Sequence, residues 1–152
     1  MREIGRRRPT PLVVLWLTGC AAPAELPPPL PPPPPLPVRS NISGTYDARL
    51  AGTGAGWRFI ITDADGTLTG AYFIQSSPTA EFQRAGDLVG SAVQRPAQAL
   101  TQDVTLALSG TFVGTFTGTA TGRSRLMGMV EYRSADGSVS GPHEITFVRS
   151  GF

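Results

Sequence analysis

The chain has 152 residues, with 13 basic and 11 acidic residues, one cysteine and one histidine. These counts exclude an internal disulfide and a zinc site built from several cysteine or histidine ligands. Residues 1–19 hold four arginines and one glutamate, so the rest of the chain has nine basic and ten acidic residues. The net charge of residues 20–152 is therefore about −1, which gives no reason to expect a nucleic-acid partner.

The first twenty residues have the pattern of an export signal followed by the only cysteine. Four arginines precede the apolar residues 12–17, and small residues stand just before Cys20. A basic start, a short apolar core and small residues before a cleavage site are typical of secretion signals. The apolar run is far shorter than the ~20 residues that a membrane-spanning helix needs. The alternative is an uncleaved hydrophobic terminus with Cys20 as a buried thiol.

The string Leu17-Thr18-Gly19-Cys20 resembles the lipobox of bacterial lipoprotein precursors. The resemblance implies removal of residues 1–19, a diacylglycerol group on the thiol of Cys20 and an acyl chain on its new amino group. These acyl chains are the only cofactor we expect, and membrane lipid is the expected partner of Cys20. No aspartate follows Cys20, so the resemblance implies a cell-envelope location at the outer membrane of a Gram-negative organism, or otherwise at the outer face of the plasma membrane.

Residues 20–40 are expected to form a stalk that follows the lipidated cysteine. The stretch 23–38 is dominated by proline, which fixes φ and removes the amide donor, so helix and sheet are excluded there. Polyproline II structure rises ~3.1 Å per residue, which makes such a stretch a semi-rigid spacer. The alternative is a ligand for a proline-binding groove, because P-x-x-P occurs several times.

Residues 41–152 are expected to form one all-β domain. Glycine and threonine are dense, no long 3.6-residue period occurs, and alternation with period two is common. Asp65-Gly66 and Asp136-Gly137 supply hairpin-turn chemistry. The expected strands, in chain order, are Ile42–Leu50, Trp57–Thr62, Thr67–Gln75, Asp87–Val93, Asp103–Ser109, Gly110–Gly118, Arg125–Arg133 and His143–Arg149.

The order of these strands predicts a single antiparallel eight-stranded meander barrel. The connections are short and no crossover helix is available, so consecutive strands should be neighbours. Glycine alternates with phenylalanine on one face of residues 110–118, which suits a strand that coils sharply around a small interior. Closure would remove exposed edges. The alternative is a two-sheet β-sandwich.

Residues 42–46, 57–62 and 65–72 are similar to the opening strands of avidin and streptavidin, which are eight-stranded barrels. The chain also resembles the wider set of avidin-like and lipocalin-like barrels on bacterial lipoproteins. Of the family's biotin contacts in this stretch, only a tyrosine is matched, by Tyr72. Ala48, Trp57 and Ile74 stand where the family has an asparagine and two serines. The resemblance therefore implies the fold and not biotin binding.

No catalytic site is expected from the sequence. His143 has no nucleophile motif to act upon, and Asp63 and Asp65 suit a turn better than a calcium loop. We therefore expect no enzyme and no metal. The remaining carboxylates considered for acid–base chemistry are scattered along the chain, namely Asp47, Asp87, Asp103, Glu131 and Glu144.

The sequence predicts a lipid-anchored, non-catalytic barrel that binds a small apolar ligand or has a structural role. Tyr46, Trp57 and Tyr72 are the candidate pocket residues, because an eight-stranded barrel is just wide enough for its own side chains or for one small ligand. The alternative is an inhibitor of another protein, or an envelope assembly factor, acting through the loops at residues 76–86 and 94–101.

Overall fold

The structure is a computed structural model that describes residues 30–32, 39–51, 53–96, 98 and 100–151. The chain divides into two compact units, residues 1–34 and residues 35–152. In the first unit, the described residues 30–32 are exposed and have no regular secondary structure. The expected signal, Cys20 and most of the expected stalk lie outside the described residues. Within the described ranges there is no helix of the length and apolarity needed to cross a membrane.

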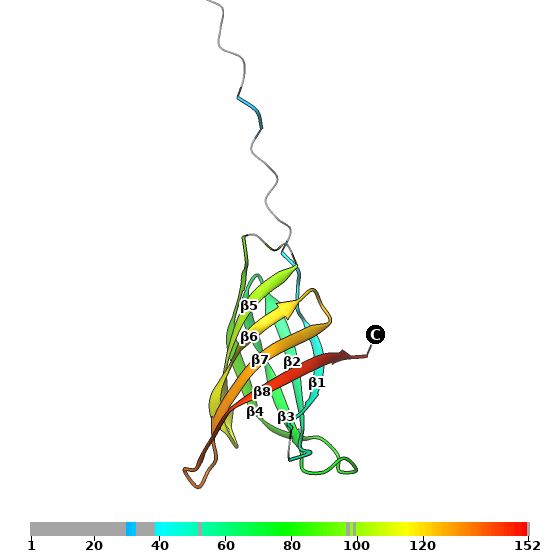
Figure 1. The fold of residues 1–152 in the computed structure, drawn as a ribbon, viewed down its shortest axis with the longest axis vertical. Coiled ribbons are helices and arrows are strands. Elements are labelled where there is room, and N and C mark those ends of the chain that lie inside the picture. Colours follow the sequence, from blue (N-terminus) through cyan, green and yellow to red (C-terminus); the bar gives the residue numbers. More distant parts are fainter. Residues whose placement is uncertain (1–29, 33–38, 52, 97, 99, 152) are drawn as a thin grey trace, which may run out of the picture. The chain divides into compact units, whose positions relative to one another are not determined.

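The second unit is an all-β domain whose strands close into one antiparallel barrel (Figure 1). Each strand pairs with the next along the chain, as the meander prediction requires. The strands are β1 (Gly44–Arg49), β2 (Gly56–Ala64), β3 (Thr67–Gln75), β4 (Gln83–Gln94), β5 (Thr101–Gly110), β6 (Val113–Thr121), β7 (Arg125–Arg133) and β8 (Val139–Ser150).

The barrel closes where β1 meets β8. Only three residue pairs join these strands, with Tyr46 opposite Arg149 at the centre. Because the first and last strands are hydrogen-bonded, the sandwich alternative is wrong. We call the end of the barrel that carries residues 39–42, the β2–β3 turn, the β6–β7 turn and the end of β8 the proximal end. The opposite end, with the β1–β2, β3–β4, β5–β6 and β7–β8 connections, is the distal end.

The third and seventh strands have their expected bounds, and three of the other six differ by three residues or more at one end. The fourth begins at Gln83, because a bulge opposite Tyr72 and Phe73 lets pairing continue past Asp87. The sixth begins at Val113, since Gly110 ends β5 and residues 111–112 form the bend. The eighth begins at Val139 and contains Pro142, which is tolerated because the ladder with β7 is irregular there.

Glycines let the strands approach closely enough to coil around a narrow interior. Gly118 on β6 lies opposite Gly128 on β7. A Cβ atom on Gly128 would lie 2.2 Å from the carbonyl oxygen of Thr117 and 2.6 Å from the Cα of Gly118. A residue with a side chain does not fit at so close an approach. The glycine-rich pattern of the sixth strand therefore reflects tight coiling of the strands, as the sequence predicts.

Candidate functional site

Tyr46, Trp57 and Tyr72 all lie in the buried core of the barrel. Each is at most 2% exposed. Trp57 stacks on Tyr72 with ring centroids 5.9 Å apart and an interplanar angle of 14°. Phe59, on the strand between them, lies opposite Tyr46 in one strand pair and opposite Tyr72 in the next. The structure thus brings Trp57 and Tyr72 together and leaves Tyr46 apart.

Trp57 is the centre of an aromatic cluster at the distal end. Its indole also contacts Phe112, at 5.8 Å between centroids, and Tyr132, at 5.4 Å. Phe112 and Tyr132 are themselves 4.9 Å apart. Aromatic pairs at these separations stabilise one another beyond their burial alone. The sequence identified Trp57 and Tyr72 but missed Tyr132, whose strand has no other aromatic residue to draw attention to it.

The two tyrosine hydroxyls are occupied by backbone partners. The hydroxyl of Tyr46 donates to the carbonyl of Ile42 at 2.9 Å. The hydroxyl of Tyr72 donates to the carbonyl of Phe112 at 2.8 Å and accepts from the amide of Phe112 at 2.9 Å. Burial raises the pKa of both tyrosines, so both hydroxyls stay protonated at neutral pH. Both hydroxyls therefore have their hydrogen-bonding capacity used by the barrel's own backbone.

The middle of the barrel is filled by three phenylalanines. Phe59 and Phe147 stack with centroids 4.1 Å apart, and Phe116 meets both edge to face at 6.1 Å and 5.8 Å. All three are fully buried. Aliphatic side chains from the other strands complete the packing, including Leu68, Leu88, Leu106, Leu126, Val130 and Ile145. The barrel's own side chains therefore occupy the space that a small apolar ligand would take.

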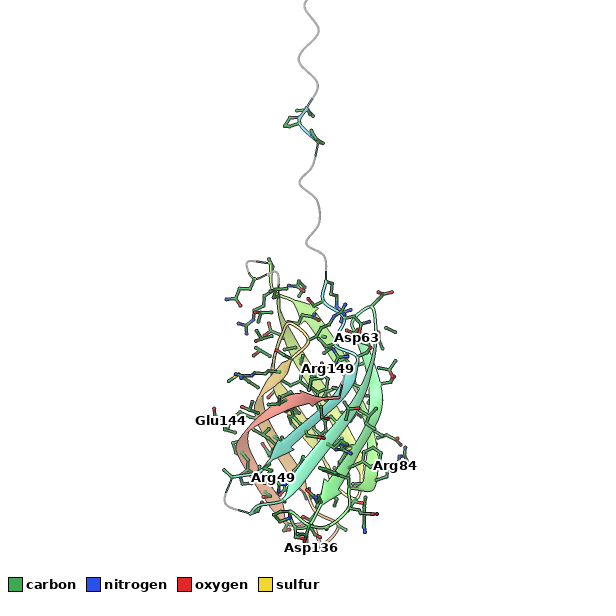
Figure 2. All side chains as sticks on the ribbon, turned by 90° about the vertical axis from the view of Figure 1, so that its right-hand side faces the viewer. Arg49, Asp63, Arg84, Asp136, Glu144 and Arg149 are labelled. Carbon is green, nitrogen blue, oxygen red and sulfur yellow. The ribbon has the colours of Figure 1, made fainter. Side chains whose placement is uncertain are left out.

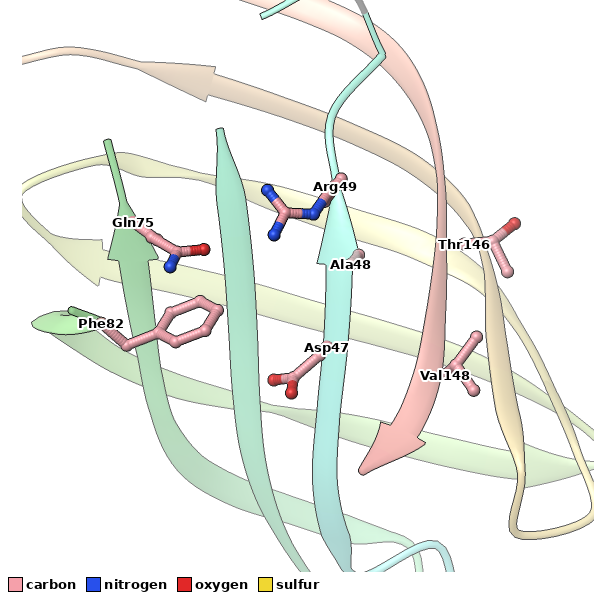
Figure 3. Close-up of a pocket in the computed structure, with 7 residues that line it drawn as sticks. All are labelled: Asp47, Ala48, Arg49, Gln75, Phe82, Thr146 and Val148. Atoms are coloured by element: carbon pink, nitrogen blue, oxygen red, sulfur yellow. The ribbon is translucent and has the colours of Figure 1, made fainter. Parts of the chain in front are cut away.

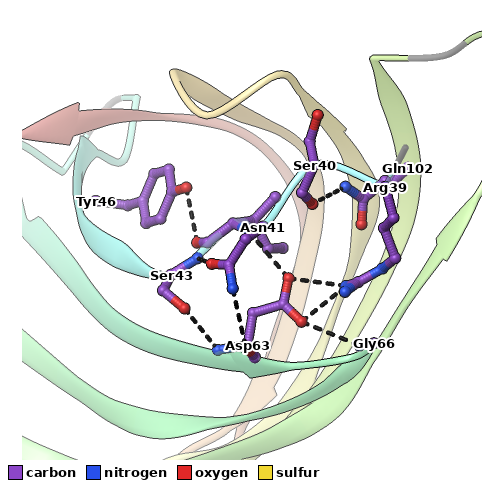
Figure 4. Close-up of polar contacts among 9 residues, drawn as sticks. Arg39, Ser40, Asn41, Ser43, Tyr46, Asp63, Gly66 and Gln102 are labelled. Carbon is purple, nitrogen blue, oxygen red and sulfur yellow. Dashed lines mark hydrogen bonds and ion pairs between the residues drawn. The ribbon is translucent and has the colours of Figure 1, made fainter. Parts of the chain in front are cut away.

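A polar network at the proximal end ties the chain before β1 to the β2–β3 turn (Figure 4). The carboxylate of Asp63 accepts from the guanidinium of Arg39 through both oxygens at 2.8 Å. The same carboxylate accepts from the amides of Ile42 and Gly66, each at 3.0 Å. The side-chain amide of Gln102 donates to the carbonyl of Ser40. Arg39 and Ser40 precede the expected domain boundary at residue 41, and both bond to barrel residues.

The Asp63 carboxylate is fully buried, with no exposed side-chain surface. Burial by itself raises its pKa, but the hydrogen bonds from the Ile42 amide, Arg39 and the Gly66 amide outweigh that effect, so its pKa is lowered. Asp65 takes a left-handed conformation with φ of 52°, followed by Gly66 at 96°. Asp63 and Asp65 therefore serve the turn, as local turn chemistry predicts.

A cleft of about 390 Å³ lies at the seam beside β1 (Figure 3). Asp47 in this cleft is held by Arg58, whose Nε lies 2.6 Å from Oδ1 of Asp47, and Arg58 also covers the ring of Phe82 at 4.1 Å. Arg49 is the cleft's remaining cation, and its only described contact is a 3.4 Å hydrogen bond to the carbonyl of Gly54. Gln75 donates to the carbonyl of Ala80. These contacts join β1 to β2 on the outside of the barrel and hold the β3–β4 connection against β2 and the end of β3.

A second cleft, of about 610 Å³, opens at the proximal end. It lies between the β6–β7 turn, which supplies Arg123 and Ser124, and the end of β8, which supplies Val148 and Arg149. Gly151 completes its lining. We call it the proximal cleft. Sequence reasoning missed it, because its two arginines are 26 positions apart and are brought together by the antiparallel pairing of β7 with β8, in which Arg125 lies opposite Val148.

His143 has a serine partner that the sequence did not reveal. The hydroxyl of Ser140 lies 2.8 Å from Nε2 of His143, within β8. A serine and a histidine at this distance meet the first requirement of nucleophilic catalysis, but an orienting partner for the other ring nitrogen is also needed. Among the described residues, no hydrogen bond to Nδ1 of His143 is present. The pair lies beside the distal aromatic cluster, with the ring of Tyr132 at 6.2 Å.

The candidate carboxylates are dispersed over the outer wall. Asp47, Asp87 and Asp103 each pair with an arginine within 2.6 Å. Glu131 and Glu144 are exposed on β7 and β8. In the part of the chain that the structure describes, no group of three histidine, cysteine, aspartate or glutamate side chains is placed to hold a metal ion.

The loops expected to face a partner are shorter than the sequence suggested. The β3–β4 connection covers residues 76–82 and the β4–β5 connection residues 95–100, because β4 extends over residues 83–94. The β3–β4 connection lies at the distal end and the β4–β5 connection at the proximal end, so the two do not form one surface.

Comparisons of this chain with models of protein families, with curated proteins and with solved structures found no match.

Proposed function

We propose that this chain is a lipid-anchored protein of the cell envelope whose barrel acts without catalysis, through its outer surface and its ends. The anchoring is supported by the string Leu17-Thr18-Gly19-Cys20 after a basic and apolar leader. Acyl chains contribute ~0.8 kcal/mol per buried methylene, so several chains on Cys20 would anchor the protein durably. The location follows the same resemblance: the outer membrane of a Gram-negative organism, or else the outer face of the plasma membrane.

The mode of action is supported by one observation above all, the filled interior. The phenylalanine group of Phe59, Phe116 and Phe147 takes up the middle of the barrel. The hydroxyls of Tyr46 and Tyr72 are bonded to backbone. A ligand inside would have to displace these contacts, so binding at the exterior is favoured over a small apolar ligand in the interior. This leaves the protein-facing role, as inhibitor or assembly factor, as the leading proposal.

The outer wall of β6, β7 and β8 offers a suitable surface for such a partner. Met127 and Met129 are exposed side by side on β7, at 44% and 41%. Met127 lies between Thr119 and Thr146 in the register, without a charged neighbour across either strand. Methionine side chains adapt to varied partner surfaces, so this wall suits contact with another envelope protein.

The anchor is tested by labelling the full chain in a bacterial host with an alkyne-bearing palmitate. We expect label and membrane fractionation for the unchanged protein and for the control Ala22→Ser, and loss of both for Cys20→Ser. Retention of label in Cys20→Ser would refute the anchor. Native mass spectrometry of the purified protein tests the filled interior: we expect the mass of the protein alone, whereas a bound apolar molecule whose retention depends on Trp57 would favour the interior pocket.

A further inference from the structure

The proximal cleft carries two guanidinium groups that have no carboxylate partner among the described residues. Four ion pairs occur in this part of the chain, and they use Arg39, Arg58, Arg84 and Arg95. Arg123 and Arg149 are in none of them. Both residues line the cleft, so two positive charges lie close to it, and their field favours an anionic ligand.

The positions of both arginines are constrained by the barrel. The backbone carbonyl of Arg123 lies 3.4 Å from the buried hydroxyl of Tyr46, and the backbone amide of Arg149 donates to the carbonyl of Ser124 at 2.9 Å. The guanidinium of Arg149 lies over Gly44, where a Cβ atom would come within 2.7 Å of its Nε. The charges of Arg149 and Arg123 act on the same group, since both lower the pKa of Tyr46 against the larger effect of burial.

The charge of the barrel is also distributed unevenly between its ends. Figure 2 shows where Asp63 and Arg149 lie toward the proximal end and where Asp136 lies at the distal end. If each strand is divided at its midpoint, the proximal half has Arg39, Arg95, Arg123, Arg125 and Arg149 against Asp63, Asp65 and Asp103, a net charge of +2. The distal half has four arginines and six acidic residues, a net charge of −2. An anion is therefore drawn toward the end where the cleft lies.

We propose that the proximal cleft binds a phosphate group, held between the guanidinium groups of Arg123 and Arg149. The planar fork of arginine matches phosphate oxygens in a bidentate manner. Ser124 also lines the cleft, with its hydroxyl donating to the carbonyl of Thr121 at 3.3 Å, and Val148 adds an apolar side chain that suits the carbon chain of a phosphate ester. A volume of about 610 Å³ is in the range of small-molecule sites.

The phosphate could belong to a soluble ester or to an anionic lipid headgroup, and the same two arginines would recognise either. Residue 39, where the described chain enters the barrel, lies at this proximal end. In an anchored protein, a headgroup bound in the cleft would turn this end toward the membrane surface. The phosphate site itself does not depend on the anchor, so the two proposals can fail separately.

The test uses the full chain with Cys20→Ser, so that an acyl anchor makes no contribution. Binding is measured to vesicles of phosphatidylglycerol or phosphatidylcholine, and to glycerol 3-phosphate and inorganic phosphate, at low salt because screening weakens surface charges. The site variant is Arg123→Gln with Arg149→Gln. The matched control is Arg49→Gln with Arg133→Gln, which removes two distal arginines that likewise have no ion-pair partner among the described residues.

A lipid headgroup site is supported if phosphatidylglycerol vesicles bind, phosphatidylcholine vesicles do not, and the site variant weakens binding by about fivefold for each arginine removed while the control does not. A soluble-ester site is supported if glycerol 3-phosphate binds equally well without vesicles and the same variant loses it. The proposal is overturned if site and control variants lose binding equally, if acetate competes as well as phosphate, or if no phosphate compound binds. Equal melting temperatures of the two variants would show that both are folded.

Discussion

The guanidinium of Arg39 meets the buried carboxylate of Asp63 across 24 positions of sequence, with its Nη2 2.8 Å from each carboxylate oxygen. This contact ties the segment before β1 to the end of β2. The carboxylate also accepts hydrogen bonds from the backbone amides of Ile42 and Gly66. One side chain thus joins the chain's entry into the barrel to its first hairpin turn, and removing its charge should loosen both.

We expect Asp63→Asn to destabilise the protein by about 2–3 kcal/mol, because hydrogen bonds to charged groups contribute ~1.5–3 kcal/mol each and at least one cannot be replaced. Urea unfolding measures the change. The matched control is Asp65→Asn, two residues on and exposed, where asparagine also accepts the left-handed conformation. The control should stay within about 0.5 kcal/mol of the unchanged protein. Equal losses in the two variants would contradict the network.

The free energy of unfolding should fall in acid, because two carboxylates stabilise the folded protein only while they are ionised. Hydrogen bonds to Asp63 and Asp47 lower their pKa values in the folded protein. The unfolded chain, with aspartate pKa values of about 3.9, then binds protons first. Their contribution to the free energy of unfolding is complete above about pH 5 and is lost as the pH falls through about 3.9 toward the lower pKa values of the folded protein. Urea midpoints at several pH values should show this loss, and a weaker loss in Asp63→Asn; identical profiles would contradict it.

Tyr72→Phe should cost about 1–3 kcal/mol, since it leaves the backbone amide and carbonyl of Phe112 without their partner. Tyr132→Phe is the control, because Tyr132 belongs to the same aromatic cluster but no side-chain hydrogen bond from it is present among the described residues. Thermal unfolding distinguishes the two. A control as costly as Tyr72→Phe would mean that the hydroxyl bond to Phe112 is not what holds the β5–β6 bend.

Gly128→Ala should destabilise the barrel by about 1–3 kcal/mol or prevent its closure, because the new methyl group would meet the backbone of β6. The control Met129→Ala changes the next residue, which faces outward, and should stay within about 0.5 kcal/mol. The near-ultraviolet circular dichroism of Trp57 reports whether the packed interior survives. An unperturbed Gly128→Ala protein would show that β6 and β7 do not approach so closely in solution.

The sequence alone predicted the fold class, the strand number and the meander order, because period-two alternation and glycine turns are local signals that pairing preserves. Asp65-Gly66 and Asp136-Gly137 are turns in the structure as predicted. Strand ends were less accurate: the bulge opposite Tyr72 and Phe73 and the irregular pairing around Pro142 extend strands past residues that ordinarily end them.

Only the tertiary structure shows how the inward aromatic residues pack against one another. Alternation places Tyr46, Trp57 and Tyr72 on inward faces, but whether that interior stays open depends on how tightly the strands coil, which rests on contacts such as Gly118 against Gly128. The proximal cleft likewise depends on pairing between strands. Arg123 and Arg149 come together because β7 and β8 pair with Arg125 opposite Val148, and this register follows an irregularity near Val130 and Tyr132 that leaves no signal within either strand.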